Sequence, residues 1–306
     1  SRAGAAATQW LSRALVGAKN VTKGNIHAEI FSDAASRSIR AATVQRLSSW
    51  SGSTAAVVVS AASPLSDFFV APADPYASAC IVSATMTCTN VTALPGASSG
   101  FKFNTIPSSA ITLTGVTADA ADAVHAVTVS GNSVITVDGF SALTGSSCGL
   151  YASGFSGLST LAVAQATITA TAGTGLVATA FVGGGASVTA DNIEVTGTAD
   201  GARIDAWGTG GAATITDSVF TGGSGSGVAL GTLTSATASF TNVTASTGAG
   251  GNDGFRITTP TTCTLAFHGV AASSSTTGAG ILATGASDTG LTVDGFSDVK
   301  GASCGL

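Results

Sequence analysis

The sequence of 306 residues has few charged side chains and few of the residues that form most catalytic and metal sites. Lys, Arg, Asp and Glu make up 9% of it, and it contains five Cys, three His, two Tyr and one Met. Nucleic-acid binding needs a dense stripe of basic residues, so this partner is not expected. His27, His125 and His268 share no metal-ligand spacing, and we therefore expect no metal or other cofactor.

Long hydrophobic runs are also missing. The longest candidate, "TAAVVVSAAS" (54–63), is shorter than the roughly 18 apolar residues that a membrane-spanning helix needs, so no membrane span is expected. The chain is nevertheless 44% hydrophobic, with a mean hydropathy of +0.46. Disordered chains combine low hydrophobicity with high charge. The composition therefore predicts a folded protein.

Cysteine spacing gives little information. The five Cys fit no zinc pattern, and an odd count leaves at least one thiol unpaired within the chain. Cys80 and Cys88 are close enough in sequence to be a candidate disulfide. Three Asn-Val-Thr sequences are candidate N-glycosylation sites, at Asn20, Asn90 and Asn242.

The clearest signal is an internal repeat. "TVDGFSALTGSSCGL" (136–150) and "TVDGFSDVKGASCGL" (292–306) agree at 11 of 15 positions. The similarity extends to two larger units, 88–150 and 240–306. Cys148 and Cys304 occupy equivalent positions in the repeat, six shorter units apart, and so cannot pair within one chain.

A shorter unit of about 25 residues lies inside the large one. Apolar residues alternate with small or polar ones, and a large apolar residue closes each run, nine times in all. These closing residues are Val91, Val116, Phe140, Ile168, Ile193, Val219, Val243, Val270 and Phe296. Alternation with period two predicts strands, and short units joined by Gly, Ser and Thr turns are typical of a solenoid.

We therefore predict an all-β fold, a right-handed parallel β-helix of about nine coils over 81–306, preceded by a small mixed capping and assembly region over 1–80. The segment "ATQWLSRALVGA" (7–18) has the pattern of a short amphipathic helix. Coils stacked about 4.8 Å apart would give a rod of roughly 40 Å.

Stretches such as "ATITDSVFTGGSGSGVAL" (213–230) and "ATASFTNVTASTGAGGNDGFRI" (236–257) resemble the coils of right-handed β-helix proteins. Proteins with the pectin-lyase-like fold and bacterial surface adhesins of the polymorphic outer-membrane type look like this. The resemblance covers about 84–306 and implies the fold. It implies little about activity, because one fold serves many functions.

Carboxylates recur two residues before the closing apolar residue, at Asp138, Asp191, Asp217 and Asp294. Asp191 and Asp217 fall on adjacent coils, where a shared position would place their carboxylates about 5 Å apart. Such a pair could share a proton or bind Ca²⁺ weakly. The alternative is that Asp is used here because it favours turns.

A second candidate surface is "ADGARIDAWG" (199–208), where Arg203 lies near two carboxylates and Trp207. It could contact a sugar or a peptide, or could be a local ion pair beside a partly exposed aromatic ring. His268 takes the same repeat position as Asp294 one coil later, so the two residues are expected on one row. "FHGV" around His268 resembles the Gly-His-Gly of polygalacturonase-like enzymes, but the other motifs of that family are absent. We predict no catalytic residues.

Charge is distributed unevenly between the two ends. Residues 1–60 carry seven Lys or Arg against two acidic residues, a net +5, and 61–306 carry four against fourteen, a net −10. The sequence stops inside a coil, which predicts an unpaired strand edge open to pairing. A basic head on the acidic tail of a second copy would give an open head-to-tail polymer.

These features favour a non-enzymatic structural subunit, secreted or on a cell surface, that polymerises head to tail into a filament or surface appendage. Self is then the main partner, with glycans as further candidates. Two alternatives stay open. One is a monomeric surface adhesin or passenger that binds glycans or cells. The other is a carbohydrate-active β-helix enzyme or viral-fibre depolymerase.

Overall fold

The computed structural model describes residues 99–301 except 276 and 296, and the backbone of the strands between 29 and 93. Side chains are described from 99 onward, without those of 104, 105 and 107. The described part is an all-β parallel solenoid without helices, as the sequence predicts. The amphipathic helix predicted over 7–18 lies outside the described residues.

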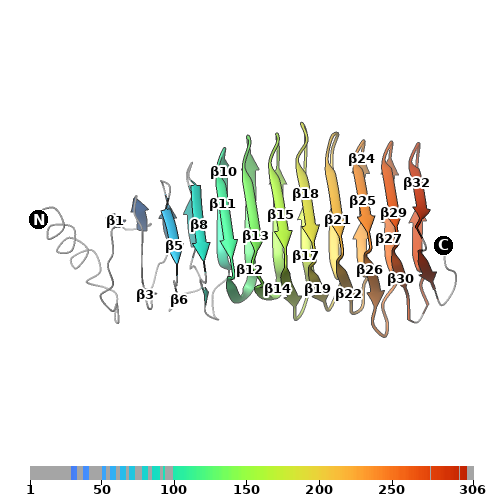
Figure 1. Cartoon of the computed structure of the whole chain (residues 1–306), viewed down its shortest axis with the longest axis horizontal. Coiled ribbons are helices and arrows are strands. Elements are labelled where there is room, and N and C mark those ends of the chain that lie inside the picture. The colour runs from blue at the N-terminus through green and yellow to red at the C-terminus, as the bar shows by residue number, and fades with distance from the viewer. Residues whose placement is uncertain are drawn as a thin grey trace, which may run out of the picture.

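Figure 1 shows the coils stacked along one long axis, with the chain advancing by one coil at a time. One side of every coil is a strand of a ten-stranded sheet, in which successive coils pair in parallel. Its strands are β5 (Ser63–Ser66), β8 (Thr85–Thr89), β11 (Ala110–Thr114), β13 (Val134–Asp138), β15 (Thr160–Ala164), β18 (Ser187–Asp191), β21 (Ala212–Thr216), β25 (Thr237–Thr241), β29 (Thr264–His268) and β32 (Gly290–Asp294). From β11 to β32 they open eight successive coils, close to the number predicted.

The other two sides of the coil belong to a seventeen-stranded sheet, in which two columns of strands are joined by the long strands β12 (Thr117–Ser130) and β14 (Ser141–Phe155). The first column also contains β3 (Trp50–Gly52), β6 (Phe69–Pro72), β9 (Thr92–Ala93), β16 (Ala166–Ala170), β19 (Glu194–Gly197), β22 (Val219–Gly222), β26 (Thr244–Thr247), β30 (Ala271–Ser273) and β33 (Asp298–Lys300). The second column contains β10 (Ser99–Pro107), β17 (Thr174–Thr179), β20 (Ala202–Asp205), β23 (Val228–Leu230), β27 (Phe255–Thr258) and β31 (Ile281–Thr284).

Two smaller sheets complete the described strands. A two-stranded parallel sheet joins successive coils through β24 (Leu233–Thr234) and β28 (Pro260–Thr261). A four-stranded sheet contains β1 (Glu29–Ser32), β2 (Arg37–Arg40), β4 (Ala56–Val59) and β7 (Ser78–Ile81). Only β1 and β2 pair antiparallel. β5 pairs in parallel with β8, and β6 with β9, so the stacked strands also include residues before residue 80.

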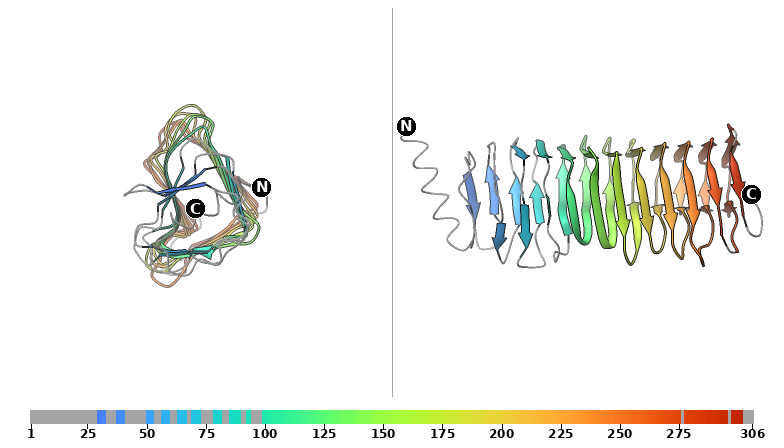
Figure 2. Two further views of the ribbon diagram at one scale, coloured as in Figure 1. Left: turned by 90° about the vertical axis from the view of Figure 1, so that its left-hand side faces the viewer. Right: turned by 60° about the horizontal axis from the view of Figure 1, so that its bottom comes forward.

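Alternation within each strand explains the core. From β11 to β29, the second residue of each strand in the ten-stranded sheet points inward, and the in-register ladder puts equivalent residues above one another. This inward row is no more than 4% exposed at Ile111, Ile135, Leu161, Val188, Ala213, Ala238 and Leu265. Viewed along the rod, the coils superpose and enclose this interior (Figure 2).

At the corner after the ten-stranded sheet, two of the predicted closing apolar residues do not lie in the core. Phe140 is 81% exposed and not inside, and Val219 is 42% exposed. Gly139 and Phe140 both have positive φ, so this coil holds one extra residue at the corner and Ser141 takes the inward position. On the same row, Ser218 replaces Val219 inside.

The two inward serines satisfy backbone groups of their neighbouring coils. Ser141 Oγ accepts from Val116 N (3.1 Å) and donates to the Asp138 carbonyl (2.6 Å). Ser218 Oγ accepts from Ile193 N (3.3 Å) in the same way. A short polar residue therefore fits the interior here because its hydroxyl is fully paired.

Candidate functional surface

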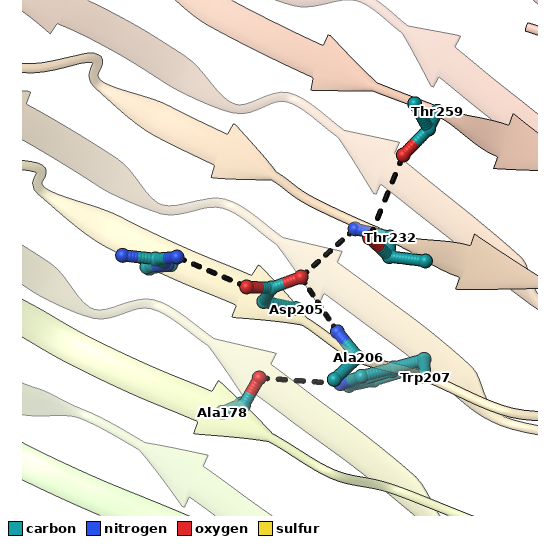
Figure 3. A network of polar contacts seen from close by, with 7 residues as sticks. Ala178, Asp205, Ala206, Trp207, Thr232 and Thr259 are labelled. Carbon is teal, nitrogen blue, oxygen red and sulfur yellow. Dashed lines mark hydrogen bonds and ion pairs between the residues drawn. The ribbon is translucent and has the colours of Figure 1, made fainter. Parts of the chain in front are cut away.

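The charged segment that the sequence indicates lies around β20, where a network of polar contacts centres on Asp205 (Figure 3). Arg203 Nη2 donates to Asp205 Oδ2 (3.0 Å), so the predicted ion pair is present. The other carboxylate oxygen, Oδ1, accepts from Ala206 N (2.7 Å) and from Thr232 N (2.8 Å) of the next coil. Asp205 therefore connects two coils as well as holding Arg203.

Asp205 is 24% exposed, and its environment acts on its pKa in opposite directions. Partial burial alone raises the pKa. The hydrogen bonds from Thr232 N, Arg203 and Ala206 N, together with the Arg203 charge, outweigh burial and lower the pKa below its ordinary value of 3.8. The carboxylate is thus held ionised, as suits a structural acceptor and not a general acid.

Trp207, expected as a partly exposed contact residue in this patch, lies inside the rod and is 2% exposed. Its Nε1 donates to the Ala178 carbonyl (3.2 Å), as Figure 3 shows. Its ring stacks on Phe181 at 4.8 Å, and Phe181 stacks on Phe155 at 4.5 Å. The expectation that Trp207 is partly exposed is therefore wrong, and its ring is not on the surface beside Arg203.

Asp191 and Asp217 do not form the predicted carboxylate pair. The ladder pairs Asp191 with Thr216, so Asp217 lies one residue further along its coil, at the positive-φ corner. Thr216 Oγ1 donates to Asp191 Oδ1, and Asn242 Nδ2 donates to Asp217 Oδ1 (3.0 Å). Each carboxylate accepts a hydrogen bond from the coil that follows, and nothing in this arrangement resembles a shared-proton dyad.

His268 and Asp294 do share a row, as the sequence predicts. His268 Nδ1 lies 2.6 Å from Asp294 Oδ1, and both side chains are more than half exposed. Thr241 precedes His268 on this row. Among these three residues of the row, only Thr241 has a hydroxyl that could act as a nucleophile. A hydroxyl nucleophile gains most from a base and an oxyanion site that exclude water, whereas this His–Asp pair is open to water.

A third polar cluster lies on β12 and β14, where the sequence pattern alone does not indicate one. His125 Nδ1 lies 2.8 Å from Asp122 Oδ2, and the ring stacks on Tyr151 at 4.8 Å. Cys148 is opposite Asp122 in the ladder. Burial, and then the Asp122 charge, raise the pKa of the Cys148 thiol to about 11. A thiol with this pKa is a poor nucleophile, so the His–Asp pair does not activate it.

The remaining predicted sites are placed only in part. Asn242 is exposed at a corner, while Asn20 and Asn90 lie outside the described residues. The side chains of Cys80 and Cys88 also lie outside them, so their disulfide stays a prediction. Residues 99–301, where described, contain no group of three or more His, Cys, Asp or Glu arranged to hold a metal ion. No helix among the described residues has the length and hydrophobicity of a membrane span.

No protein-family model, no curated protein and no solved structure matches the chain.

Proposed function

We propose that the protein is a structural, non-enzymatic subunit that assembles end to end into an extracellular filament or surface appendage. The observation that carries this proposal is the edge of the last described coil. β32 is the terminal strand of the ten-stranded sheet, and β33 pairs only with β30 among the described strands. Under the proposal, a strand of a second copy pairs with this edge.

Inward side chains of the last described coil are more exposed than their equivalents in the earlier coils. Leu291 is 39% exposed, although Leu265, its equivalent one coil earlier, is 1% exposed. Val293 and Val299 are only partly buried against the core. A further coil stacked on β32 would bury these side chains as the earlier coils bury theirs, and each apolar Å² removed from water contributes about 25 cal/mol.

Charge supports a second copy as the source of that coil. The last described coil carries three acidic residues, Asp288, Asp294 and Asp298, against Lys300 alone, whose Nζ lies 2.6 Å from Asp298 Oδ2. Residues 1–60 carry a net +5. Complementary ends of this kind speed association and select the orientation in which they meet. A head-to-tail contact leaves one free end of each kind and grows without closing.

Charged residues at the inward positions of β32 test the proposed end-to-end contact. We expect Leu291→Lys with Val293→Lys to keep the protein monomeric, because an inward charge on an edge strand blocks pairing. Thr292→Lys, on the exposed neighbouring position of the same strand, is the matched control and should still assemble. Sedimentation velocity separates the outcomes, and circular dichroism checks that each variant is folded. Equal assembly by both variants, or a monomeric unmodified protein, would contradict the proposal.

A further inference from the structure

Cationic residues of the rod are concentrated on one outward row of the second column. The ladder aligns Lys102, His125, Tyr151, Val177, Arg203, Ala229, Arg256 and Leu282, one residue from each successive coil. Residues 61–306 contain only four Lys or Arg, and three of them lie here. We call Lys102, Arg203 and Arg256 the basic row.

The members of the basic row are available to a partner. Arg203 is 55% exposed and Arg256 is exposed, while Lys102 is partly exposed. Arg203 uses one of its donors on Asp205. Within the described part of the chain, Lys102 and Arg256 have no ion-pair partner.

Carboxylates form a second row at the end of the ten-stranded sheet. The ladder there aligns Thr114 with Asp138, then Ala164, Asp191, Thr216, Thr241, His268 and Asp294. We call Asp138, Asp191 and Asp294 the acidic row. Asp191 and Asp294 are exposed and Asp138 is partly exposed. The two rows lie on different sheets, so one molecule can use both at once.

The two rows have the same gaps between charged residues, but in opposite order along the chain. Along the basic row, Lys102 and Arg203 are four coils apart, and Arg256 follows after two more. Along the acidic row, two coils separate Asp138 from Asp191 and four separate Asp191 from Asp294. At about 4.8 Å per coil, these gaps are roughly 19 Å and 10 Å in both rows.

We propose that these rows are a lateral docking surface for a second copy of the chain, in which rods lie side by side and antiparallel. In this arrangement Arg256 faces Asp138, Arg203 faces Asp191, and Lys102 faces Asp294. Parallel rods, at any shift, bring at most two of these pairs together. Because the basic and acidic rows lie on different sheets, the contact repeats and produces layers of rods.

The positions between the ion pairs are compatible with this contact. Ala229 faces Ala164 and Val177 faces Thr216, and these side chains are small or uncharged. His125 faces His268, and each of these rings already has a carboxylate of its own chain within 2.8 Å. Apart from this His–His position, the antiparallel arrangement sets no two like charges of the basic and acidic rows opposite each other.

Lateral docking is independent of the end-to-end contact and can be tested with the ends unchanged. Salt is the first probe, because charges are screened over about 10 Å at 0.1 M ionic strength and about 3 Å at 1 M. We expect side-by-side rods in electron micrographs at low salt and separate rods or single filaments at high salt. Absence of lateral association at low salt would overturn the proposal.

Charge exchange identifies the rows. Arg203→Glu with Arg256→Glu, and Asp138→Lys with Asp191→Lys, should each lower lateral association at least tenfold when alone. Mixed together, the two variants should recover it, because each altered position then faces the opposite charge. Thr196→Glu, which adds a negative charge to the exposed face of β19 outside both rows, is the control and should behave like the unmodified protein. Loss in this control, or no recovery on mixing, would show that the rows are not the contact.

Cross-linking tests the antiparallel direction. Lys102→Cys with Asp294→Cys in one chain should form intermolecular disulfides under mild oxidation, whereas Arg256→Cys with Asp294→Cys should not. The unmodified protein, with its own cysteines, sets the background. Cross-linking by the second pair and not the first would replace the antiparallel arrangement with a parallel one.

Discussion

Phe181 offers the sharpest test of how the interior is packed. Its side chain is 0% exposed and lies between two other rings, Phe155 at 4.5 Å with an interplanar angle of 7° and Trp207 at 4.8 Å with an angle of 23°. Phe181→Ala removes the central ring from this three-ring stack. Neighbouring coils hold the outer rings in place, so the space cannot close easily.

The expected loss of stability has two contributions, burial and ring stacking. Truncating a fully buried Phe to Ala costs about 3–5 kcal/mol, and each aromatic pair adds roughly 0.5–1.5 kcal/mol beyond area burial. We therefore expect a loss near the upper end, about 4–5 kcal/mol. Folded domains have about 5–15 kcal/mol in all, so the variant should unfold at a much lower denaturant concentration.

Urea unfolding followed by circular dichroism measures the shift, and Phe140→Ala is the matched control. Phe140 undergoes the same change in chemistry but is 81% exposed, so its cost should stay within about 0.5 kcal/mol. Equal shifts for the two variants, or a shift under about 1 kcal/mol for Phe181→Ala, would refute the three-ring stack in the interior.

Three further predictions concern charge and pH. The pKa of Cys148 is raised from 9.0 to about 11, so the buried thiol favours the folded state only while it is protonated. Its contribution to the free energy of unfolding is therefore complete below pH 9 and is lost as the pH rises to 11. Cys148→Ser should flatten this alkaline loss in thermal melts, and alkylation of Cys148 by iodoacetamide at pH 8 should be slow. The lowered pKa of Asp205 gives stability that is present above its ordinary pKa and disappears as the pH falls below it, so Asp205→Asn should reduce acid sensitivity in thermal melts. Asn242→Asp sets a second carboxylate against Asp217, which should cost about 0.2–1 kcal/mol, measured as the shift of the urea midpoint at pH 7.

The fold could be predicted because its physical causes repeat along the chain. Period-two alternation puts apolar residues on one face of each strand, and recurrence every 25 residues or so stacks these faces. Ile135 and Leu161 are buried as this pattern requires. The handedness of the coil stays a prediction.

Inward and outward positions at corners could not be predicted from alternation. Ala206 has a φ of 54°, which breaks the alternation that runs through Ile204 and turns Trp207 inward. The same holds at Ala180, with a φ of 56°, before Phe181. A signal was present in the spacing, since Phe155, Phe181 and Trp207 recur every 26 residues.

The extra residue at Phe140 hides the true alignment of the coils in a similar way. Phe140 has a positive φ, which is unusual for a bulky side chain. The sequence therefore predicts Phe140, and not Ser141, at the inward position. The mismatch of Asp191 and Asp217 has another origin. Ser218, not Val219, is equivalent to Ile193, so Asp217 lies at the corner position that Asn242 takes in the next coil. The His268–Asp294 row was predicted correctly, since both residues end their strands.

End-to-end assembly is tested most directly by negative-stain electron microscopy at low salt of the full chain beside a variant lacking residues 1–60, both carrying Arg203→Glu with Arg256→Glu to suppress lateral contacts. The proposed contact predicts single filaments with a regular axial repeat from the full chain and short, separate rods from the deletion variant. Short rods from the full chain, or filaments that persist without residues 1–60, would contradict it.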